Sequence, residues 1–183
     1  VIYDGKLMNF SSPRDAMDHG FALITEERKA NGLFLKGDIT FNTTIANMNH
    51  YKNGAVLSHD RMVRATAEEI KIMHTKCMGP DDMITSLSGG NQQKVVLARW
   101  LATHPKILIL NGPTVGVDIG AKYDIHKLLR ELAKQGMAVL VVSDDVAEIT
   151  ALCDRALIMK AGSMTGEFTG EDLTDDNLYK STI

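Results

Sequence analysis

The 183 residues form one large domain or most of one, because a chain of this length can bury about 70% of the surface of its unfolded state. A net charge of −3, with Lys and Arg scattered along the chain, disfavours a nucleic-acid binder. The two cysteines, Cys77 and Cys153, lie far apart and predict reduced thiols rather than metal ligands. The sequence has no apolar run of about 18 residues, so any membrane association must come through a partner.

The N-terminal part predicts a turn, a helix, a strand and a helical insertion, in that order. Residues 3–6 predict a tight turn. Ser12-Pro13 predicts a capped helix that ends at Gly20, because Pro is favoured at the first helical position. Phe21 to Ile24 predict a strand, and residues 31–82 predict a mostly helical insertion whose helical spacing is best between residues 61 and 73.

The C-terminal part alternates buried strands with helices. Residues 107–110 and 138–142 are short apolar runs typical of strands buried on both faces, and both are expected in the middle of a sheet. Between them Ile125, Leu128, Leu129 and Leu132 follow helical spacing. Residues 155–160 and 164–168 predict a hairpin, and a short helix is expected after Thr174. This alternation predicts an α/β protein with a parallel sheet.

The turn Ser88-Gly89-Gly90 directly precedes a predicted helix over residues 91–103. Ser88 can cap this helix, while the first backbone amides face outward with the positive end of the helix dipole. Such a turn can bind a phosphate. By its chemistry alone, the same pattern also fits a plain capped turn.

The residues around this turn carry a family resemblance. Leu87 to Lys94 reads LSGGNQQK, and it is followed by ILILNGPT at residues 107–114 and by Val117-Asp118. In order and spacing these segments resemble the ATP-binding cassette (ABC) ATPases, and in detail the monosaccharide importers of bacteria. Residues 4–6 and 25–29 resemble the second, C-terminal nucleotide-binding half of those tandem ATPases, so the resemblance covers nearly the whole chain.

The resemblance implies a fold and a division of the chain. The fold is a three-layer parallel sheet of the P-loop NTPase (ABC ATPase) type with a helical signature subdomain, without the Walker A strand and helix. The helical subdomain is expected at about 40–103, the sheet core in 1–39 and 104–168, and a C-terminal tail in 169–183. In such domains the signature residues contact a nucleotide held by an opposing domain, a role that Ser88, Gly89 and Gly90 would inherit. Gln92 is either a further nucleotide contact or a solvated helix residue.

Two features of the family are missing or altered. The sequence contains no Gly-x-x-x-x-Gly-Lys-Ser/Thr phosphate loop, which favours a truncated chain over a natural loss and predicts poor ATP binding by the chain alone. Asn111 and Gly112 stand where the family has an Asp that holds Mg²⁺ and a Glu that polarises water. Loss of a general base lowers the rate roughly 10²- to 10⁴-fold, so hydrolysis at this site is expected to be very slow. The alternative is that Asn111-Gly112 is merely a turn.

Three further positions match switch residues of the family. Glu26 stands at the position of the glutamine that senses metal, and Asp144 at the position of the histidine that reaches the γ-phosphate. The alternatives are a surface ion pair of Glu26 with Arg28 or Lys29, and a helix N-cap for Asp144. Asp118, which matches the aspartate that communicates across the dimer, is retained.

The resemblance predicts part of an ATP-binding subunit of a sugar importer, using ATP and Mg²⁺ in the complete assembly. Its expected partners are a second nucleotide-binding domain, in the same chain or in a homodimer, and transmembrane permease subunits, with a periplasmic sugar-binding protein acting indirectly. It would then lie in the cytoplasm, on the inner face of the membrane. Two alternatives are a non-catalytic regulatory module that dimerises with an active domain, and a soluble ATPase acting on ribosomes or DNA, which the acidic balance disfavours.

Overall fold

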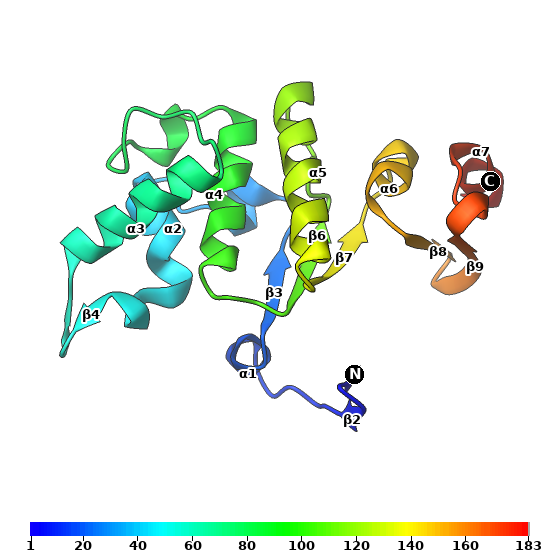
Figure 1. The fold of residues 1–183 in the computed structure, drawn as a ribbon, viewed down its shortest axis with the longest axis horizontal. Helices are drawn as coiled ribbons and strands as arrows, with labels where there is room; N and C mark the ends of the chain where they lie inside the picture. The colour runs from blue at the N-terminus through cyan, green and yellow to red at the C-terminus, as the bar shows by residue number, and fades with distance from the viewer. Residues whose placement is uncertain (183) are drawn as a thin grey trace.

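A computed structural model describes residues 1–182, and its centre is a parallel sheet of three strands. The strands are β3 (Phe21–Ile24), β6 (Ile107–Asn111) and β7 (Ala138–Val142), in the order β3-β6-β7. Phe21 pairs with Ile107, and Ile107 pairs with Ala138. The prediction of an α/β protein with a parallel sheet is confirmed (Figure 1).

Helices cover one face of this sheet. The signature-bearing helix α4 (Gly89–Leu101) packs against β3, and α5 (Ile119–Lys134) packs against β7. On the covered face Ile24, Leu108 and Leu110 are fully buried and form the core together with residues of α4 and α5. The core therefore lies between the sheet and the two helices that begin near the predicted site.

The other face of the sheet is only partly covered within residues 1–182, where Tyr3 and Phe10 pack on Phe21. Leu23 of β3 is 49% exposed, and Leu140 and Val142 of β7 are each 53% exposed. The expectation that both C-terminal strands lie in the middle of the sheet is wrong for β7, which forms an edge of the described sheet. Its apolar run reflects burial of one face only, because Val139 and Val141 contact the core while the alternate residues do not.

The N-terminal segment follows its prediction closely. The strands β1 (Ile2–Tyr3) and β2 (Lys6–Leu7) form a short hairpin, and α1 (Pro13–Asp18) begins after Ser12. Ser12 Oγ accepts a hydrogen bond from the Asp15 amide at 3.1 Å, as expected for an N-cap.

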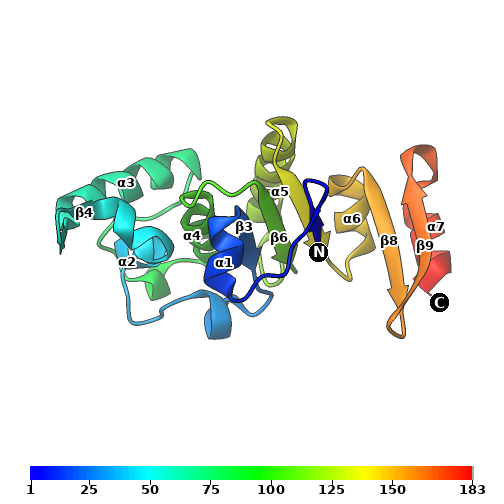
Figure 2. The ribbon, with the colours of Figure 1, turned by 90° about the horizontal axis from the view of Figure 1, so that it is seen from below.

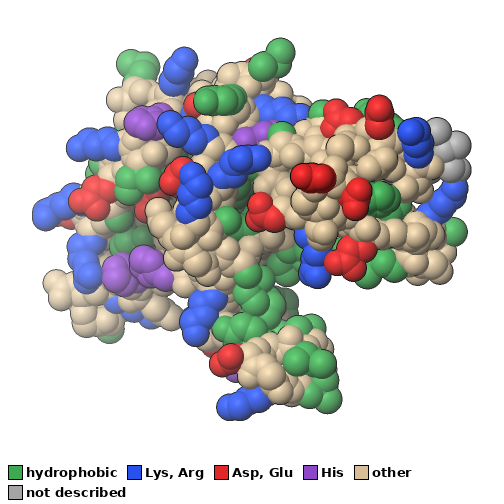
Figure 3. Space-filling view, turned by 45° about the vertical axis from the view of Figure 1, so that its right-hand side comes forward, with side chains coloured by type: hydrophobic (Ala, Val, Ile, Leu, Met, Phe, Trp, Pro, Cys, Tyr) green, Lys and Arg blue, Asp and Glu red, His purple; other side chains and the backbone are tan. Residues whose placement is uncertain are grey.

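Figure 3 shows hydrophobic side chains on the lobe at the bottom of the view, and positive and negative side chains interspersed over the rest of that face.

The insertion between β3 and α4 is mostly helical, as predicted. A π-helical turn η1 (Arg28–Gly32) leads to the helical segments, and a small hairpin lies among them that the pattern did not predict. The segments are α2 (Ile39–Thr44), η2 (Ile45–Tyr51), the hairpin of β4 (Lys52–Asn53) and β5 (Val56–Leu57), α3 (His59–Ile72) and η3 (Ile84–Ser86). The proposed division of the chain into a helical subdomain and a sheet core stays a prediction.

The C-terminal part forms a separate hairpin flanked by two helices (Figure 2). Strands β8 (Arg155–Lys160) and β9 (Ser163–Thr169) pair with each other, as predicted. Helix α6 (Val146–Leu152) precedes them, and η4 (Gly170–Asp172) and α7 (Asp175–Thr182) follow. No helix of residues 1–182 combines the length and the apolar character that crossing a membrane requires.

Candidate functional site

The signature turn, Ser88-Gly89-Gly90, forms the N-terminus of α4. Ser88 is the N-cap, and its Oγ accepts hydrogen bonds from Asn91, at 3.5 Å from the backbone amide and at 2.9 Å from Nδ2. Within residues 1–182 the amides of Gly89 and Gly90 bond to no acceptor. Ser88 is exposed, so an exposed hydroxyl and two unbonded amides stand at the positive end of a helix of 13 residues. This arrangement can bind an anion.

Gln92 lies beneath this turn rather than on its surface. The residue is 5% exposed, and its Nε2 donates to the carbonyl oxygens of Ile84 and Leu87, both at 3.2 Å. The alternative of a solvated helix residue is therefore wrong. Gln92 holds the backbone that leads into Ser88, and a nucleotide contact of Gln92 stays a prediction.

The N-termini of α4 and α5 meet at Gly90. A Cβ atom on Gly90 would lie 2.4 Å from the Cβ of Ala121 and 3.0 Å from Oδ2 of Asp118, so only glycine fits there. Asp118 is the N-cap of α5, and its Oδ1 accepts a hydrogen bond from the Ala121 amide at 3.0 Å. The structure thus brings Asp118 next to the signature turn. The role of Asp118 across a dimer stays a prediction.

The carboxyl ends of β3 and β6 bring two altered positions together. A Cβ atom on Gly112 would lie 2.9 Å from Cγ of Glu26, and Gly112 has a φ of +59° that favours glycine. The Gly112 amide donates to the carbonyl oxygen of Val142 at 2.8 Å, which fixes the turn after Asn111 against β7. Gly112 lies in a turn, closed by the bond from the Val115 amide to the Gly112 carbonyl oxygen at 3.2 Å, and a catalytic role for Asn111 and Gly112 stays a prediction.

Glu26 itself makes no ion pair within the described residues, so the proposed pairing with Arg28 or Lys29 is not formed. The guanidinium of Arg28 donates hydrogen bonds instead to two carbonyl oxygens of the loop after β6. Glu26 is exposed and lines a concavity together with Arg28, Val115 and Gly116. Glu26 therefore remains available to a ligand or a partner at this edge of the sheet.

Asp145, and not Asp144, is the N-cap of α6. Asp145 Oδ1 accepts a hydrogen bond from the Glu148 amide at 3.2 Å, and its Oδ2 accepts one from Lys122 Nζ at 2.5 Å. The N-cap interpretation of Asp144 is therefore wrong, and the cap falls one residue later. Asp144 is exposed and forms no hydrogen bond or ion pair within residues 1–182.

Replacing Asp145 by Asn is expected to remove a pH-dependent part of the stability. The hydrogen bond from Lys122 lowers the pKa of the Asp145 carboxyl below its ordinary value of 3.8. The stabilisation is therefore complete above the pKa of the unfolded state and is lost as pH falls through the lower pKa of the folded state. Because Asn still caps a helix, we expect the variant to lose about 0.2–1 kcal/mol at pH 7. Urea titrations at pH 7 and pH 3 check this, and an equal loss at both pH values would contradict it.

A buried polar cluster joins the loop after β6 to α5 and α6. Glu148 is 2% exposed, and its Oε1 accepts a hydrogen bond from Thr114 Oγ1 at 2.5 Å and lies 3.1 Å from Nε2 of His126. The sequence reasoning missed this cluster, since its members come from three separate segments. The cluster fixes the loop that follows Asn111 relative to the helix that follows Asp144.

The residues at the end of β6 do not fit a magnesium site of their own. Magnesium is bound in proteins through one or two carboxylates together with phosphate oxygens. Asn111 supplies only a neutral amide and Gly112 no side chain. Among residues 1–182 no group of three or more His, Cys, Asp or Glu side chains could hold a metal ion.

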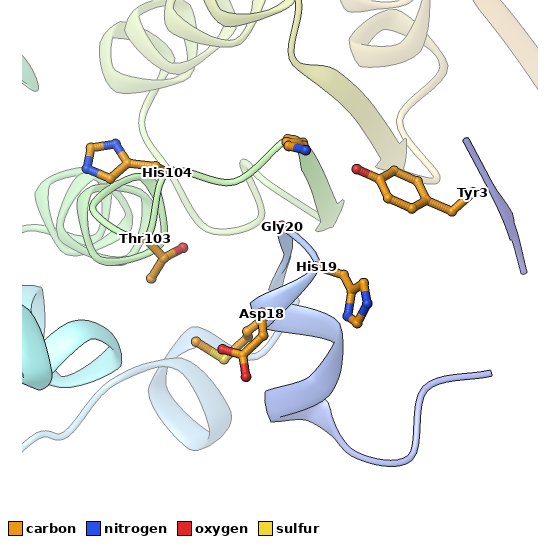
Figure 4. Close-up of a pocket in the computed structure, with 8 residues that line it drawn as sticks. Tyr3, Asp18, His19, Gly20, Thr103 and His104 are labelled. Carbon is orange, nitrogen blue, oxygen red and sulfur yellow. The ribbon is translucent and has the colours of Figure 1, made fainter. Parts of the chain in front are cut away.

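A pocket at the opposite end of the sheet contains none of the predicted site residues. It lies where the chain enters β3 and β6, and Figure 4 shows Tyr3, His19 and His104 around it, with Gly20 between them. Asp18, Met17, Thr103 and Lys106 complete its lining. The predicted residues gather instead at the carboxyl ends of the strands and at the helix N-termini, where ligands of open α/β sheets bind.

Comparisons with known proteins agree with this arrangement. The family model described as ABC transporter matches residues 8–115. The chain is 42% identical to the galactose/methyl galactoside import ATP-binding protein MglA of Treponema denticola, and 41% identical to that of Escherichia coli strain K12. Each match covers 98% of this chain and 36% of the relative, so the chain spans about a third of the length of these relatives.

Solved structures show the same fold. A nucleotide-free ATP-binding cassette from an ABC transporter superimposes with a TM-score of 0.78 at 21% identity, covering 97% of this chain and 72% of that one. A dimeric cassette in a post-hydrolysis state bound to ADP and Pi gives a TM-score of 0.72 at 22% identity, covering 91% of this chain and 71% of that one. The expected fold class is confirmed.

Proposed function

Because this chain belongs to the ABC transporter family of ATP-binding domains, we propose that its signature turn completes a nucleotide site on a second nucleotide-binding domain. The observation that carries the proposal is the N-terminus of α4, where the hydroxyl of Ser88 and the unbonded amides of Gly89 and Gly90 present donors for an anion. The γ-phosphate of ATP bound to the opposing domain has the charge and the acceptor atoms that these donors need.

The chain's own site is proposed to hydrolyse ATP slowly or not at all. Asn111 and Gly112 provide neither a charged metal ligand nor a general base. The positive φ of Gly112, and the 2.9 Å that would separate an added Cβ atom from Cγ of Glu26, also oppose a larger side chain there. Hydrolysis would therefore take place at the other site of the pair.

The proposed cargo and partners are supported by the relatives. Proteins about 42% identical to this chain are named for the import of galactose and methyl galactoside, which supports a monosaccharide as the cargo. The proposed assembly contains transmembrane permease subunits and lies at the cytoplasmic face of the membrane, with a periplasmic sugar-binding protein delivering the sugar. Within this assembly ATP and Mg²⁺ are bound at the interface of the two domains, and the chain couples hydrolysis of that ATP to sugar uptake.

A second candidate is a regulatory module that binds nucleotide at the interface without contributing to turnover. The loss of both carboxylates at Asn111 and Gly112 favours it. The two candidates differ in whether Ser88 is needed for hydrolysis at the partner's site.

Replacing Ser88 by Ala is expected to lower ATP hydrolysis by the complete importer about tenfold or more, because a positioned donor to a transition-state charge is lost. The matched control is Ser12→Ala, which removes an equivalent N-cap hydrogen bond from α1, far from the site. Each variant is expected to lose about 0.5–2 kcal/mol of stability through its cap. ATPase assays on reconstituted importer check the difference in rate.

Equal rates for Ser88→Ala and Ser12→Ala would favour the regulatory module. A second arm of the experiment inactivates the partner's catalytic glutamate and leaves this chain unchanged. Hydrolysis is then expected to fall to the background rate, and substantial remaining hydrolysis would show that the site at Asn111 and Gly112 is active.

A further inference from the structure

Arg28 joins three segments of the candidate site. It lies in η1, directly after the segment that carries Glu26, and its Nη1 and Nη2 donate to two successive carbonyl oxygens of the loop after β6. The distances are 2.6 Å to Val115 and 3.0 Å to Gly116. A planar guanidinium with two parallel donors suits such a pair of acceptors, which a lysine ammonium cannot reproduce.

The same guanidinium lies against the signature turn. A Cβ atom on Gly89 would stand 2.6 Å from Nη2 of Arg28 and 2.8 Å from the carbonyl oxygen of Gly116. Gly89 therefore packs on a surface made by Arg28 and by the loop that Arg28 holds. The Nε atom of Arg28 is buried and has no partner within residues 1–182, so the two carbonyl bonds alone direct the guanidinium.

We propose that Arg28 is a positioning residue, which sets the place of the signature turn relative to the segment after β3 through its paired bonds to Val115 and Gly116. The inference rests on the proposed function, in which Ser88, Gly89 and Gly90 serve a nucleotide on the opposing domain. In this role Arg28 acts through Gly89 and the loop after β6, and not by contact with the nucleotide. It holds the loop after β6 in the position against which Gly89 packs. The donors of the signature turn then keep a fixed position relative to the phosphate.

The test compares Arg28→Lys and Arg28→Ala in the complete importer with Arg14→Ala as the control. Arg14 is an exposed arginine whose ion pair with Asp18 lies on the surface of α1. Misplacing a reacting group by about 1 Å can lower a rate about 100-fold, so we expect both Arg28 variants to lower kcat about 10- to 100-fold. The KM for ATP is expected to stay within about twofold, since ground-state binding depends on the partner's phosphate loop. Arg14→Ala is expected to match the wild type.

Each other outcome overturns the inference. A wild-type kcat for Arg28→Lys would show that charge alone suffices, and loss of the folded protein in both variants would show a purely structural role. A rise in KM that accounts for the whole effect would place Arg28 in nucleotide binding instead. Ser88→Ala is measured alongside: if it hydrolyses ATP at the wild-type rate, the proposed function itself fails, and if it alone is slow, only the inference about Arg28 fails.

Discussion

Replacing Gly90 by Ala is expected to push the signature helix away from α5 and to reduce ATP hydrolysis by the complete importer by an order of magnitude or more. The added methyl group would stand 2.4 Å from the Cβ of Ala121, a contact that the two helix backbones can relieve only by moving apart. Overpacking of this kind lowers the free energy of unfolding by about 1–3 kcal/mol. ATPase rates and urea titrations measure the two effects.

The control for this prediction is Gly79→Ala, because a Cβ atom on Gly79 would meet nothing within 4 Å and its φ is not in the left-handed region. A change within about 0.5 kcal/mol is expected there. The double variant Gly90→Ala with Ala121→Gly removes the closer contact and is expected to recover part of the rate, judged against Ala121→Gly alone. A Gly90→Ala protein with the wild-type rate and stability would show that α4 and α5 do not pack closely at Gly90.

Replacing Arg99 by Leu is expected to cause a large loss of stability. Arg99 is 5% exposed, and its guanidinium donates to the carbonyl oxygens of Asn42 and Gly32 at 2.5 and 2.6 Å and to Oδ1 of Asn42 at 2.9 Å. Burial lowers its pKa to about 10. Leucine would leave buried carbonyl oxygens without donors, so we expect a loss of about 2–4 kcal/mol, measured by urea denaturation.

Arg61→Leu is the matched control for Arg99. Arg61 also donates to a backbone carbonyl oxygen, that of Lys52 at 2.6 Å, but this contact is exposed to water. Its replacement is expected to change stability by no more than about 0.5 kcal/mol. Equal losses of stability for the two substitutions would show that the buried hydrogen bonds of Arg99 do not hold η1 and α2 onto α4.

Local signals in the sequence were enough to predict the regular elements. The capping Ser12 with Pro13, and the apolar runs at β3, β6 and β7, each act over a few residues, and the structure has the elements where these signals lie. The small hairpin of β4 and β5 was missed although Asn53-Gly54 is a strong turn signal, because its strands are only two residues long. The position of β7 at the sheet edge depends on which strands it pairs with, and its own residues do not specify that.

The site was predictable in its backbone and less so in its side chains. The turn at Ser88 and the cap at Asp118 follow from residue type and position. Gln92 is buried because α4 is buried around its whole circumference from Gln92 to Arg99, which the polar side chains in this stretch do not indicate. The cap of α6 falls at Asp145, one residue after the position considered, and two adjacent Asp residues are both acceptable caps by residue type. The contacts of Arg28 with Val115 and Gly116 join distant segments, and the sequence held no signal for them.

The pairing of β3 with β6 bears on how the chain acquires its fold. Residues 25–106, which include the signature turn, lie between two strands that are immediate neighbours in the sheet. Closing so long a loop carries an entropic penalty before any strand contact forms, and such non-local pairing is slow. During synthesis on the ribosome, β3 cannot pair with β6 until α4, which lies between them in the chain, has been synthesised. The signature helix is therefore already synthesised when the sheet closes, and the loop after β6 can pack against it only after that.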